Sequence, residues 1–200
     1  MFQEFRHLRL QEARAVEQLL APSQVKPPAT LRSPALTVMT DFTKTAPVTV
    51  PQTWQVDTAL EWMKSQHVRM LFVVDGQGRF AGVVTAGDIA GSKVQAYAEQ
   101  HGADRGDVLV RHIMMSRLHI RALTFEQVEN ATIGDVMLTM QGSGDQHVVV
   151  IDESDAGVKR VRGVVSASDI SRLLKVSFDV MYEAKTFAEI EKIVAHGGEL

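Results

Sequence analysis

The pattern of apolar and polar positions in the first half of the chain predicts a short α/β unit. Four apolar residues fall at i, i+3, i+4 and i+7, the buried face of an amphipathic helix: Val56, Ala59, Leu60 and Met63. A short strand at 48–50 precedes this helix, and the unbroken apolar run at 70–74 predicts a buried strand. Residues 75–78 predict a hairpin turn before a return strand at 80–84, and a second helix runs from Asp88 to near Gly102. The predicted order is β-α-β-β-α.

The second half of the chain repeats this pattern. Adding 77 to the four helical positions gives a second apolar stripe: Ile133, Val136, Met137 and Met140. The same offset aligns the strand at 70–74 with residues 147–151, and after the hairpin the offset becomes 81. Four additional residues are therefore expected in the second hairpin, around 153–159, where insertions are tolerated. Residues 118–123 are expected to form the first strand of this unit, and a helix with Leu173 and Leu174 follows it.

One short stretch occurs in both units, where the return strand meets the next helix. Residues 82–89 read GVVTAGDI, and residues 163–170 read GVVSASDI. Each predicts a β-branched strand leading into a helix with an aspartate in its first turn, where the helix N-terminus favours a negative charge. The adjacent hydroxyl and the exposed backbone N–H groups suit a phosphate or a sugar. One copy alone is also consistent with an ordinary capped turn, but two ordered copies favour a ligand site.

The two ends of the chain lie outside the repeat. Residues 2–20 predict a helix, and the prolines between residues 21 and 34 predict an extended connector. Residues 186–189 have the spacing of a capping box, and apolar positions precede and follow it: Phe178, Met181, Ile190, Ile193 and Val194. The expected domains are an N-terminal helix with its connector (1–34), a first unit (35–102), a second unit (103–176) and a C-terminal helical extension (177–200). The terminal apolar faces pack either on this chain's own core or on a second subunit, and the pattern leaves both open.

Composition narrows the classes of function. The 200 residues are 45% hydrophobic and 22% charged, as in soluble globular proteins, and the net charge of -3 gives no general attraction to nucleic acid or anionic membranes. There is no cysteine, which excludes a disulfide framework and a thiol nucleophile. No apolar run approaches the roughly 20 residues that span a bilayer, and the charges of Glu4, Arg6 and Arg9 stand where a signal peptide would be apolar. We therefore expect a cytoplasmic protein with no nucleic-acid or membrane partner.

The sequence contains no recognisable catalytic motif. Seven histidines are scattered without the paired spacing of metal ligands, so no metal site is expected. Residues 141–145 superficially resemble a phosphate loop but lack the Walker lysine, and the repeat places them at the end of a helix, where glycine acts as a cap. Arg117, His119 and Arg121 alternate as they would along a strand, and we expect them on a solvated face. No catalytic residue is predicted.

Each unit resembles a CBS domain, the module first described in cystathionine β-synthase, and the two together resemble a CBS pair, or Bateman module. The matching features are the apolar strand that ends at Asp75 or Asp152 and the pattern Gly-apolar-apolar-Thr/Ser-x-x-Asp, within roughly residues 36–175. The resemblance implies an α/β (α+β) fold in which the two units pack sheet to sheet with pseudo-two-fold symmetry, flanked by the terminal helices. It also implies two symmetry-related clefts that bind adenosine-containing ligands such as AMP, ADP, ATP or S-adenosylmethionine.

The same resemblance implies which residues line these clefts. Thr85 with Asp88, and Ser166 with Asp169, match the residues that approach the phosphate and the ribose hydroxyls. The adenine is expected against apolar positions in and before the strands. In one cleft these are Thr43, Val48 and Val68, facing the motif of the other domain; Ile120 and Val164 belong to the second cleft, and Val83 completes the set.

The sequence departs from the family pattern at the strand that begins near residue 70. The proline common there is Phe72 in the first unit and Val149 in the second. The basic residue sometimes found just before the apolar run is Met70 in the first unit and His147, also a predicted ligand-binding residue, in the second. Because histidine is a weaker and pH-dependent phosphate partner than arginine, a nucleoside or monophosphate is expected more than a triphosphate.

Three functions remain open on the sequence. The first is a stand-alone sensor, not an enzyme, which requires no cofactor and binds an adenine nucleotide or S-adenosylmethionine as a regulatory ligand. It would transmit ligand occupancy to its own homodimer interface or to an unidentified protein partner. The second is a constitutive protein-interaction or dimerisation module with vestigial ligand clefts. The third is a hydrolase or nucleotide-modifying enzyme.

Overall fold

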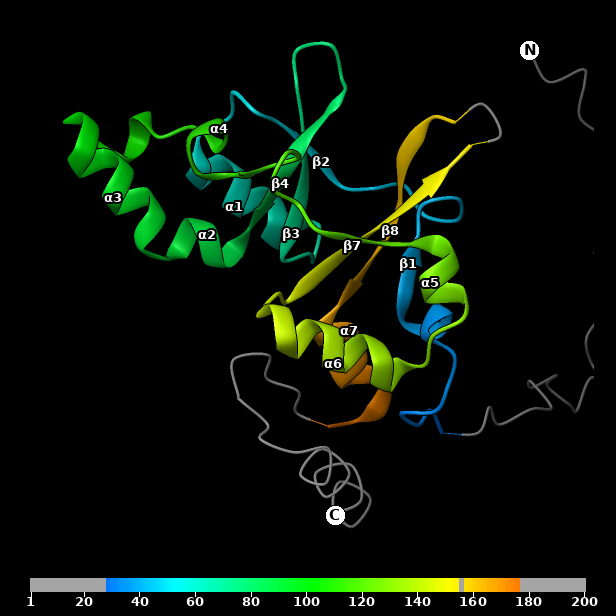
Figure 1. Ribbon diagram of the computed structural model, residues 1–200. Coiled ribbons are helices and arrows are strands. Elements are labelled where there is room, and N and C mark those ends of the chain that lie inside the picture. The colour runs from blue at the N-terminus through cyan, green and yellow to red at the C-terminus, as the bar shows by residue number, and fades with distance from the viewer. Residues whose placement is uncertain (1–27, 155–156, 177–200) are drawn as a thin grey trace, which may run out of the picture.

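A computed structural model describes residues 28–154 and 157–176 of the chain. Its centre is formed by two four-stranded sheets, with strand orders β2-β3-β4-β5 and β1-β8-β7-β6 (Figure 1). The predicted helix at 2–20 and the predicted C-terminal extension lie outside the described residues. Among the helices within 28–154 and 157–176, none is both long and apolar enough to cross a membrane.

The first unit follows the predicted order of elements. They are β2 (Thr49–Pro51), α1 (Val56–Ser65), β3 (Met70–Val74), β4 (Phe80–Thr85), α2 (Ala86–Ala90) and α3 (Ser92–His101). Strand β2 is parallel to β3, and β3 is antiparallel to β4. Three residues of the predicted helical stripe are buried on α1, whereas Leu60 is only partly buried. The predicted second helix is divided into α2 and α3, because the backbone is extended at Gly91 (φ -86°, ψ -167°).

The second unit repeats these elements with a different start. They are β6 (Ala122–Thr124), α5 (Phe125–Glu129), α6 (Ile133–Ser143), β7 (His147–Glu153), β8 (Lys159–Ser166) and α7 (Ala167–Leu174). All four predicted stripe residues are buried on α6, and Gly144 ends this helix with a φ of 74°, as the sequence predicted. The first strand is shorter than the predicted 118–123, because residues 117–121 form a turn and an irregular segment. On the last helix, α7, Leu174 packs against the core of this unit, whereas the side chain of Leu173 is 40% exposed.

The two sheets pack face to face and are related by pseudo-symmetry. Phe72 lies opposite Val83 in the first sheet, and Val149 lies opposite Val164 in the second. Both strand pairs shift register one step after these residues, between 73 and 74 and between 150 and 151. The inner faces meet in one apolar cluster, whose buried members are Met70, Phe72, Val83 and Val149. The predicted sheet-to-sheet packing is therefore confirmed, and the helices cover the outer faces in two separate cores.

Each sheet also receives a short edge strand that the sequence did not predict. Strand β1 (Met39–Asp41), which follows the 3₁₀ helix η1 (Ala35–Val38), pairs antiparallel with β8 of the second sheet. Strand β5 (Met115–Ser116) pairs with β4 of the first sheet, after η2 (Arg105–Asp107) and α4 (Val110–Ile113). The residues that open the expected first unit thus lie on the second sheet, and the connection between the units lies on the first. The expected domain boundaries stay predictions.

Two glycines allow these edge strands to approach. A Cβ atom on Gly82 would overlap the carbonyl oxygen of Met115, and one on Gly163 would overlap the carbonyl oxygen of Thr40. These are the glycines that open the repeated GVV motif. The motif therefore needs glycine at its first position because another strand's backbone occupies the space of a side chain.

Strand β1 is further held by the side chain of Arg162 on β8. The guanidinium donates to both carboxylate oxygens of Asp41 at 2.9 and 3.2 Å, donates to Asp152 at 3.1 Å and lies 4.3 Å from the ring centre of Phe125. The hydrogen bonds from Arg162, followed by those from Thr43, hold the pKa of the Asp41 carboxyl well below its usual range. Among the described residues, no equivalent ion pair joins β5 to β4 in the first sheet, since Ala81 occupies the position equivalent to Arg162.

We predict that Gly82→Ala and Gly163→Ala each lower the free energy of unfolding by about 1–3 kcal/mol, because the added methyl group forces two backbones apart. Urea unfolding followed by circular dichroism measures the loss. Gly76→Ala is the matched control, since no atom lies within 4 Å of the added Cβ. A similar loss in all three variants would contradict the role assigned to the crossing strands.

Candidate functional site

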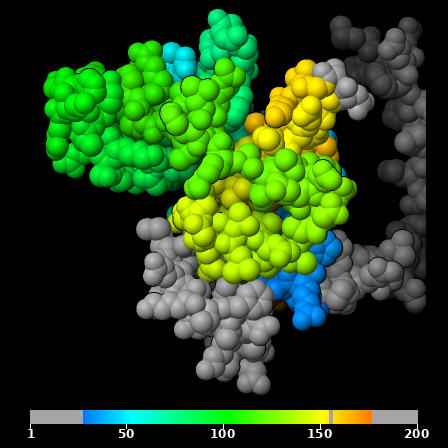
Figure 2. Space-filling model, in the orientation of Figure 1, coloured from blue at the N-terminus to red at the C-terminus, as the bar shows by residue number. Residues whose placement is uncertain are grey.

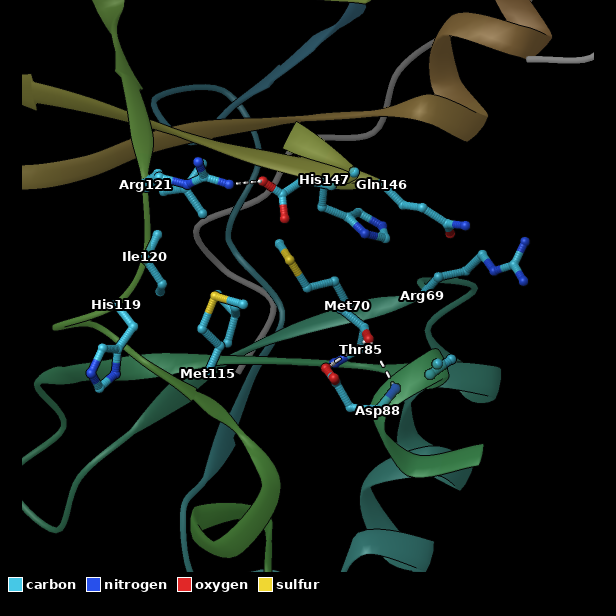
Figure 3. Close-up of a pocket in the computed structure, with 16 residues that line it drawn as sticks. Arg69, Met70, Thr85, Asp88, Met115, His119, Ile120, Arg121, Gln146 and His147 are labelled. Atoms are coloured by element: carbon cyan, nitrogen blue, oxygen red, sulfur yellow. Dashed lines mark hydrogen bonds and ion pairs between the residues drawn. The ribbon is translucent and has the colours of Figure 1, made fainter. Parts of the chain in front are cut away.

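Two clefts lie between the sheets, and the repeated strand-helix motif forms one wall of each. The Asp88 cleft has a volume of about 600 Å³ and contains Thr85 and Asp88 (Figure 3). The Asp169 cleft has a volume of about 310 Å³ and contains Ser166 and Asp169. The structure thus brings each predicted hydroxyl and aspartate together at one cleft.

Helix capping fixes the position of both aspartates. Thr85 ends β4, and its Oγ1 accepts from the Asp88 backbone N–H at 3.1 Å and donates to Asp88 Oδ2 at 2.7 Å. The Thr85 backbone N–H donates to the same oxygen at 2.9 Å. Ser166 Oγ makes the corresponding contacts with the N–H and Oδ2 of Asp169, at 3.1 and 2.7 Å. Capping therefore occupies one oxygen of each carboxylate and leaves the other directed away from the cap.

The second oxygen of each aspartate is paired with an exposed cation. Lys93 Nζ lies 2.5 Å from Asp88 Oδ1, and Arg172 Nη2 contacts Asp169 Oδ1. The side chains of Lys93 and Arg172 are 50% and 77% exposed, so water screens both pairs. A ligand hydroxyl that donates to Oδ1 would replace an interaction of low net stability, which makes this oxygen the accessible acceptor of each cleft.

The opposite wall of each cleft comes from the other unit, as predicted. Ile120, Gln146 and His147 of the second unit face the Asp88 motif (Figure 3). Val48 and Val68 of the first unit face the Asp169 motif. Each cleft therefore requires both units in their packed arrangement.

Two predicted residues have positions that differ from the expectation. Val164 was expected with Ile120, but it lines the Asp169 cleft, while Val83 lines the Asp88 cleft. The reason is strand geometry: Val164 is two residues before Ser166 and projects from the same face of β8. Thr43 lines neither cleft, because its N–H and hydroxyl donate to Asp41 at 2.9 and 2.7 Å.

The structure adds basic residues to the Asp88 cleft that sequence reasoning did not include. His119 and Arg121 were expected on a solvated strand, but both line this cleft, together with Arg69. Arg121 lies 3.6 Å from Asp145 (Figure 3). The repeat contains a signal for the position of Arg121. Thr49 pairs with Phe72, and Ala122 pairs with Val149, the residue equivalent to Phe72 in the second unit. Arg121 is therefore the counterpart of Val48, which lines the other cleft.

His147 stands between the two clefts. It lines both of them, together with Arg69 and Met70. Burial lowers the pKa of His147 from its usual value; Asp169 and, more weakly, Asp88 act in the opposite direction, while Arg69 adds to the lowering. The imidazole is therefore neutral at pH 7 and acts there as a hydrogen-bonding group without charge.

Residues 28–154 and 157–176 contain no group of three or more His, Cys, Asp or Glu side chains suited to binding a metal ion. The polar groups of the clefts are instead fixed acceptors and basic donors facing apolar residues: Met70, Val83, Met115, Ile120 and Val149 in the Asp88 cleft. This arrangement suits a ligand with hydroxyl groups, an apolar ring and a negative charge.

We predict that His147→Gln makes stability less dependent on pH. Because the pKa of His147 is lower in the folded protein than in the unfolded chain, the unfolded chain takes up the proton first as the pH falls below about 6.5. The unsubstituted protein should therefore lose up to about 1.4 kcal/mol per pH unit more than the variant between pH 6.5 and 5.5. Urea unfolding at each pH measures this difference. His119→Gln, which replaces an exposed histidine, is the control, and equal pH profiles for His147→Gln and the unsubstituted protein would refute the prediction.

Comparison with known proteins agrees with this architecture. The family model described as "CBS domain" matches residues 38–93 and 128–176, more than half of the chain. An uncharacterized conserved protein from Pyrococcus horikoshii is similar in structure, with 20% identity, a TM-score of 0.51 and coverage of 72% of this chain and 92% of that one. Protein MJ1225 from Methanocaldococcus jannaschii is 24% identical with a TM-score of 0.50, and the match covers 70% of this chain and 49% of that one. The CBS domain protein TA0289 from Thermoplasma acidophilum is 20% identical with a TM-score of 0.48, and the match covers 80% of this chain and 76% of that one. No curated protein gave a match.

Proposed function

Because the chain belongs to the CBS-domain family, we propose that it is a regulatory protein that binds an adenosine-containing ligand in its two clefts. The duplicated cap is the observation that carries this proposal. In both clefts a hydroxyl side chain holds one oxygen of an aspartate, and only an exposed cation occupies the other. An acceptor held in this way is suited to the paired hydroxyls of a ribose.

The remaining walls supply the other contacts that such a ligand needs. In the Asp88 cleft an adenine ring would lie against Val83, Met115 and Ile120, on the side away from the ribose. In the Asp169 cleft the corresponding surface is formed by Val48, Val68 and Val164. Apolar burial of the ring and directional bonds to the sugar are the usual division of roles in a nucleotide site.

The two clefts differ in volume and in the wall that faces the aspartate. The Asp88 cleft has about twice the volume of the other and carries His119 and Arg121 on that wall, whereas Arg69 lines both clefts. The Asp169 cleft has Val48 at the position equivalent to Arg121. We assign a nucleotide such as AMP to the Asp88 cleft, because this cleft is the larger and Arg121 on its opposite wall can pair with a phosphate. We assign an uncharged adenosyl group to the smaller cleft, where Arg172 already pairs with Asp169.

A binding role without catalysis completes the proposal. Occupancy of the clefts would be transmitted through the sheets to a homodimer interface or to a protein partner in the cytoplasm. The two alternatives from the sequence differ in measurable ways: an assembly module with vestigial clefts binds no adenosyl ligand, and a nucleotide-modifying enzyme releases a changed product.

We predict that Asp88→Asn combined with Asp169→Asn weakens binding of the adenosyl ligand at least about tenfold. The reason is that a hydrogen bond to a charged acceptor contributes roughly 1.5–3 kcal/mol. The measurement is a thermal-shift titration with AMP, ADP, ATP and S-adenosylmethionine, with guanosine as the comparison, since a ligand of the native state raises the melting temperature. Asp57→Asn is the control, because Asp57 is exposed and pairs with Arg105 outside both clefts. No shift with any adenosyl compound would contradict the proposal and favour the assembly module.

We further predict that Arg121→Gln weakens AMP binding about tenfold and leaves adenosine binding within about twofold, because only AMP carries the phosphate that the guanidinium contacts. Isothermal titration calorimetry with both compounds measures the two affinities. Arg111→Gln removes an exposed arginine that lines neither cleft and serves as the control. An equal loss for AMP and adenosine would show that Arg121 acts through the shape of the cleft and not through the phosphate.

A further inference from the structure

The linings of the two clefts overlap at residues that belong to neither aspartate motif. Arg69, Met70 and His147 line both clefts. We call these three residues the junction. Figure 2 shows that the first unit (cyan to green) and the second unit (yellow to orange) meet side by side, and the junction takes its residues from both. The two clefts are therefore not separate sites, because they have part of a wall in common.

Strand pairing fixes the junction beside both motifs. Met70 begins β3 and lies opposite Thr85 on β4, and His147 begins β7 and lies opposite Ser166 on β8. The carbonyl oxygen of Arg69 accepts the backbone N–H of the first residue of α2 at 2.9 Å. Each strand start is thereby held next to a capping hydroxyl. A ligand group that extends from either hydroxyl to the junction therefore approaches the same side chains.

The junction contains the one cation of the two linings that no carboxylate neutralises in the described part of the chain. The other cations beside the clefts are each paired with a carboxylate: Arg121 with Asp145, Lys93 with Asp88, and Arg172 with Asp169. Within residues 28–154 and 157–176 the exposed Arg69 makes no ion pair. A phosphate from either cleft can therefore pair with Arg69 without displacing a carboxylate.

His147 is the second basic group of the junction, and its charge depends on pH. Its imidazole is neutral at pH 7, because burial and then Arg69 lower its pKa, although Asp169 and Asp88 act to raise it. Two more histidines line the clefts, one in each, and both are exposed: His119 and His67. A phosphate in either cleft adds negative charge beside the imidazole, as the two aspartates do. It therefore raises the pKa of His147, and the anion binds together with a proton.

The junction can neutralise only one phosphate at neutral pH. A phosphate carries a charge of about -1.5 to -2 at pH 7. When a nucleotide in one cleft pairs with Arg69, a second nucleotide brings a like charge to the same junction and finds His147 uncharged. Like charges that share one partner repel each other. An adenosyl ligand without a phosphate does not encounter this repulsion.

We propose that Arg69 and His147 form a single anion subsite that the two clefts share. At neutral pH the protein binds one phosphorylated adenosyl ligand together with one that lacks a phosphate, and two phosphorylated ligands weaken each other's binding. In weakly acidic solution His147 takes up a proton and supplies a second cation, so that both clefts accept a phosphate. This inference rests on the function proposed above, and it adds which combinations of ligands bind together.

Isothermal titration calorimetry of the full-length protein tests the exclusion at neutral pH. The second AMP should bind the unsubstituted protein at least about tenfold more weakly than AMP binds the Asp169 cleft of Asp88→Asn, in which the other cleft is weakened. Adenosine has no phosphate, so its affinities in the same two measurements should agree within about twofold. Equal AMP affinities in the two proteins would overturn the shared subsite and leave the binding of adenosyl ligands standing. No binding of AMP or adenosine would overturn both proposals.

A permanent charge at the junction should remove the exclusion. His147→Arg should strengthen binding of the second AMP about tenfold at neutral pH, because arginine supplies the second cation without a proton. His119→Arg is the matched control, since it adds the same charge to the Asp88 cleft alone, and it should change the affinity of the second AMP by less than about twofold. An equal gain in the two variants would show a general effect of charge and would overturn the role of the junction.

A pH series tests the proton in the unsubstituted protein. The second AMP should bind about fivefold more tightly near pH 6 than at neutral pH, and His147→Gln should lose this gain. The phosphate of AMP itself takes up protons near pH 6, but this contribution is the same in both proteins. Calorimetry in two buffers of different ionisation enthalpy should show greater proton uptake in the unsubstituted protein than in His147→Gln. Identical pH dependence and proton uptake in the two proteins would overturn the proposal.

Discussion

Apolar contact between the inner faces of the two sheets is the interaction on which the rest of this structure depends. Met70, Phe72 and Val83 of the first sheet meet Val149 of the second. Side chains alternate between the two faces of a strand, so the same strands carry the separate helix-covered cores on their outer faces. The two clefts are regions where this single interface is not filled. Their shapes therefore depend on how the two sheets are held together.

Exchange of edge strands holds that arrangement. Because β1 lies on β8 and β5 lies on β4, each sheet is completed by residues outside its own repeat. The close approach requires Gly82 and Gly163, and Arg162 adds a partly buried ion pair on the second sheet. A connection of this kind makes the two units parts of one body. Sliding one sheet along the other would break backbone hydrogen bonds as well as apolar contacts.

The clefts share one design and differ in their chemistry. Both use a hydroxyl cap to fix an aspartate, which is a local property of the strand-to-helix turn. Their opposite walls are unequal, because Arg121 and His147 stand where the other unit has Val48 and Met70. Since His147 lines both clefts, a negative charge placed in one also acts on the wall of the other. Pseudo-symmetry of the backbone is thus compatible with two different ligands.

The sequence by itself determined the repeat, most of the helices and strands, and the cap residues. These follow from local spacing: an apolar stripe at helical intervals, an unbroken apolar strand, and a hydroxyl three residues before an aspartate in each motif. It also placed the two motifs opposite the other unit's strands, through resemblance to a known family.

Only the tertiary structure decided which long-range neighbours complete each feature. Strands β1 and β5 have three and two residues, too few for a periodic signal, and exist because distant strands pair with them. The sequence predicted a solvated strand face for His119 and Arg121. They lie far from Asp88 in the sequence, so their spacing gives no sign that they share a cleft with it. Thr43 donates to Asp41 and lines neither cleft, and Val164 lines the Asp169 cleft instead of the predicted one. In both cases the face of the strand and the pairing of the sheets decide the contact, and sequence spacing alone does not encode them.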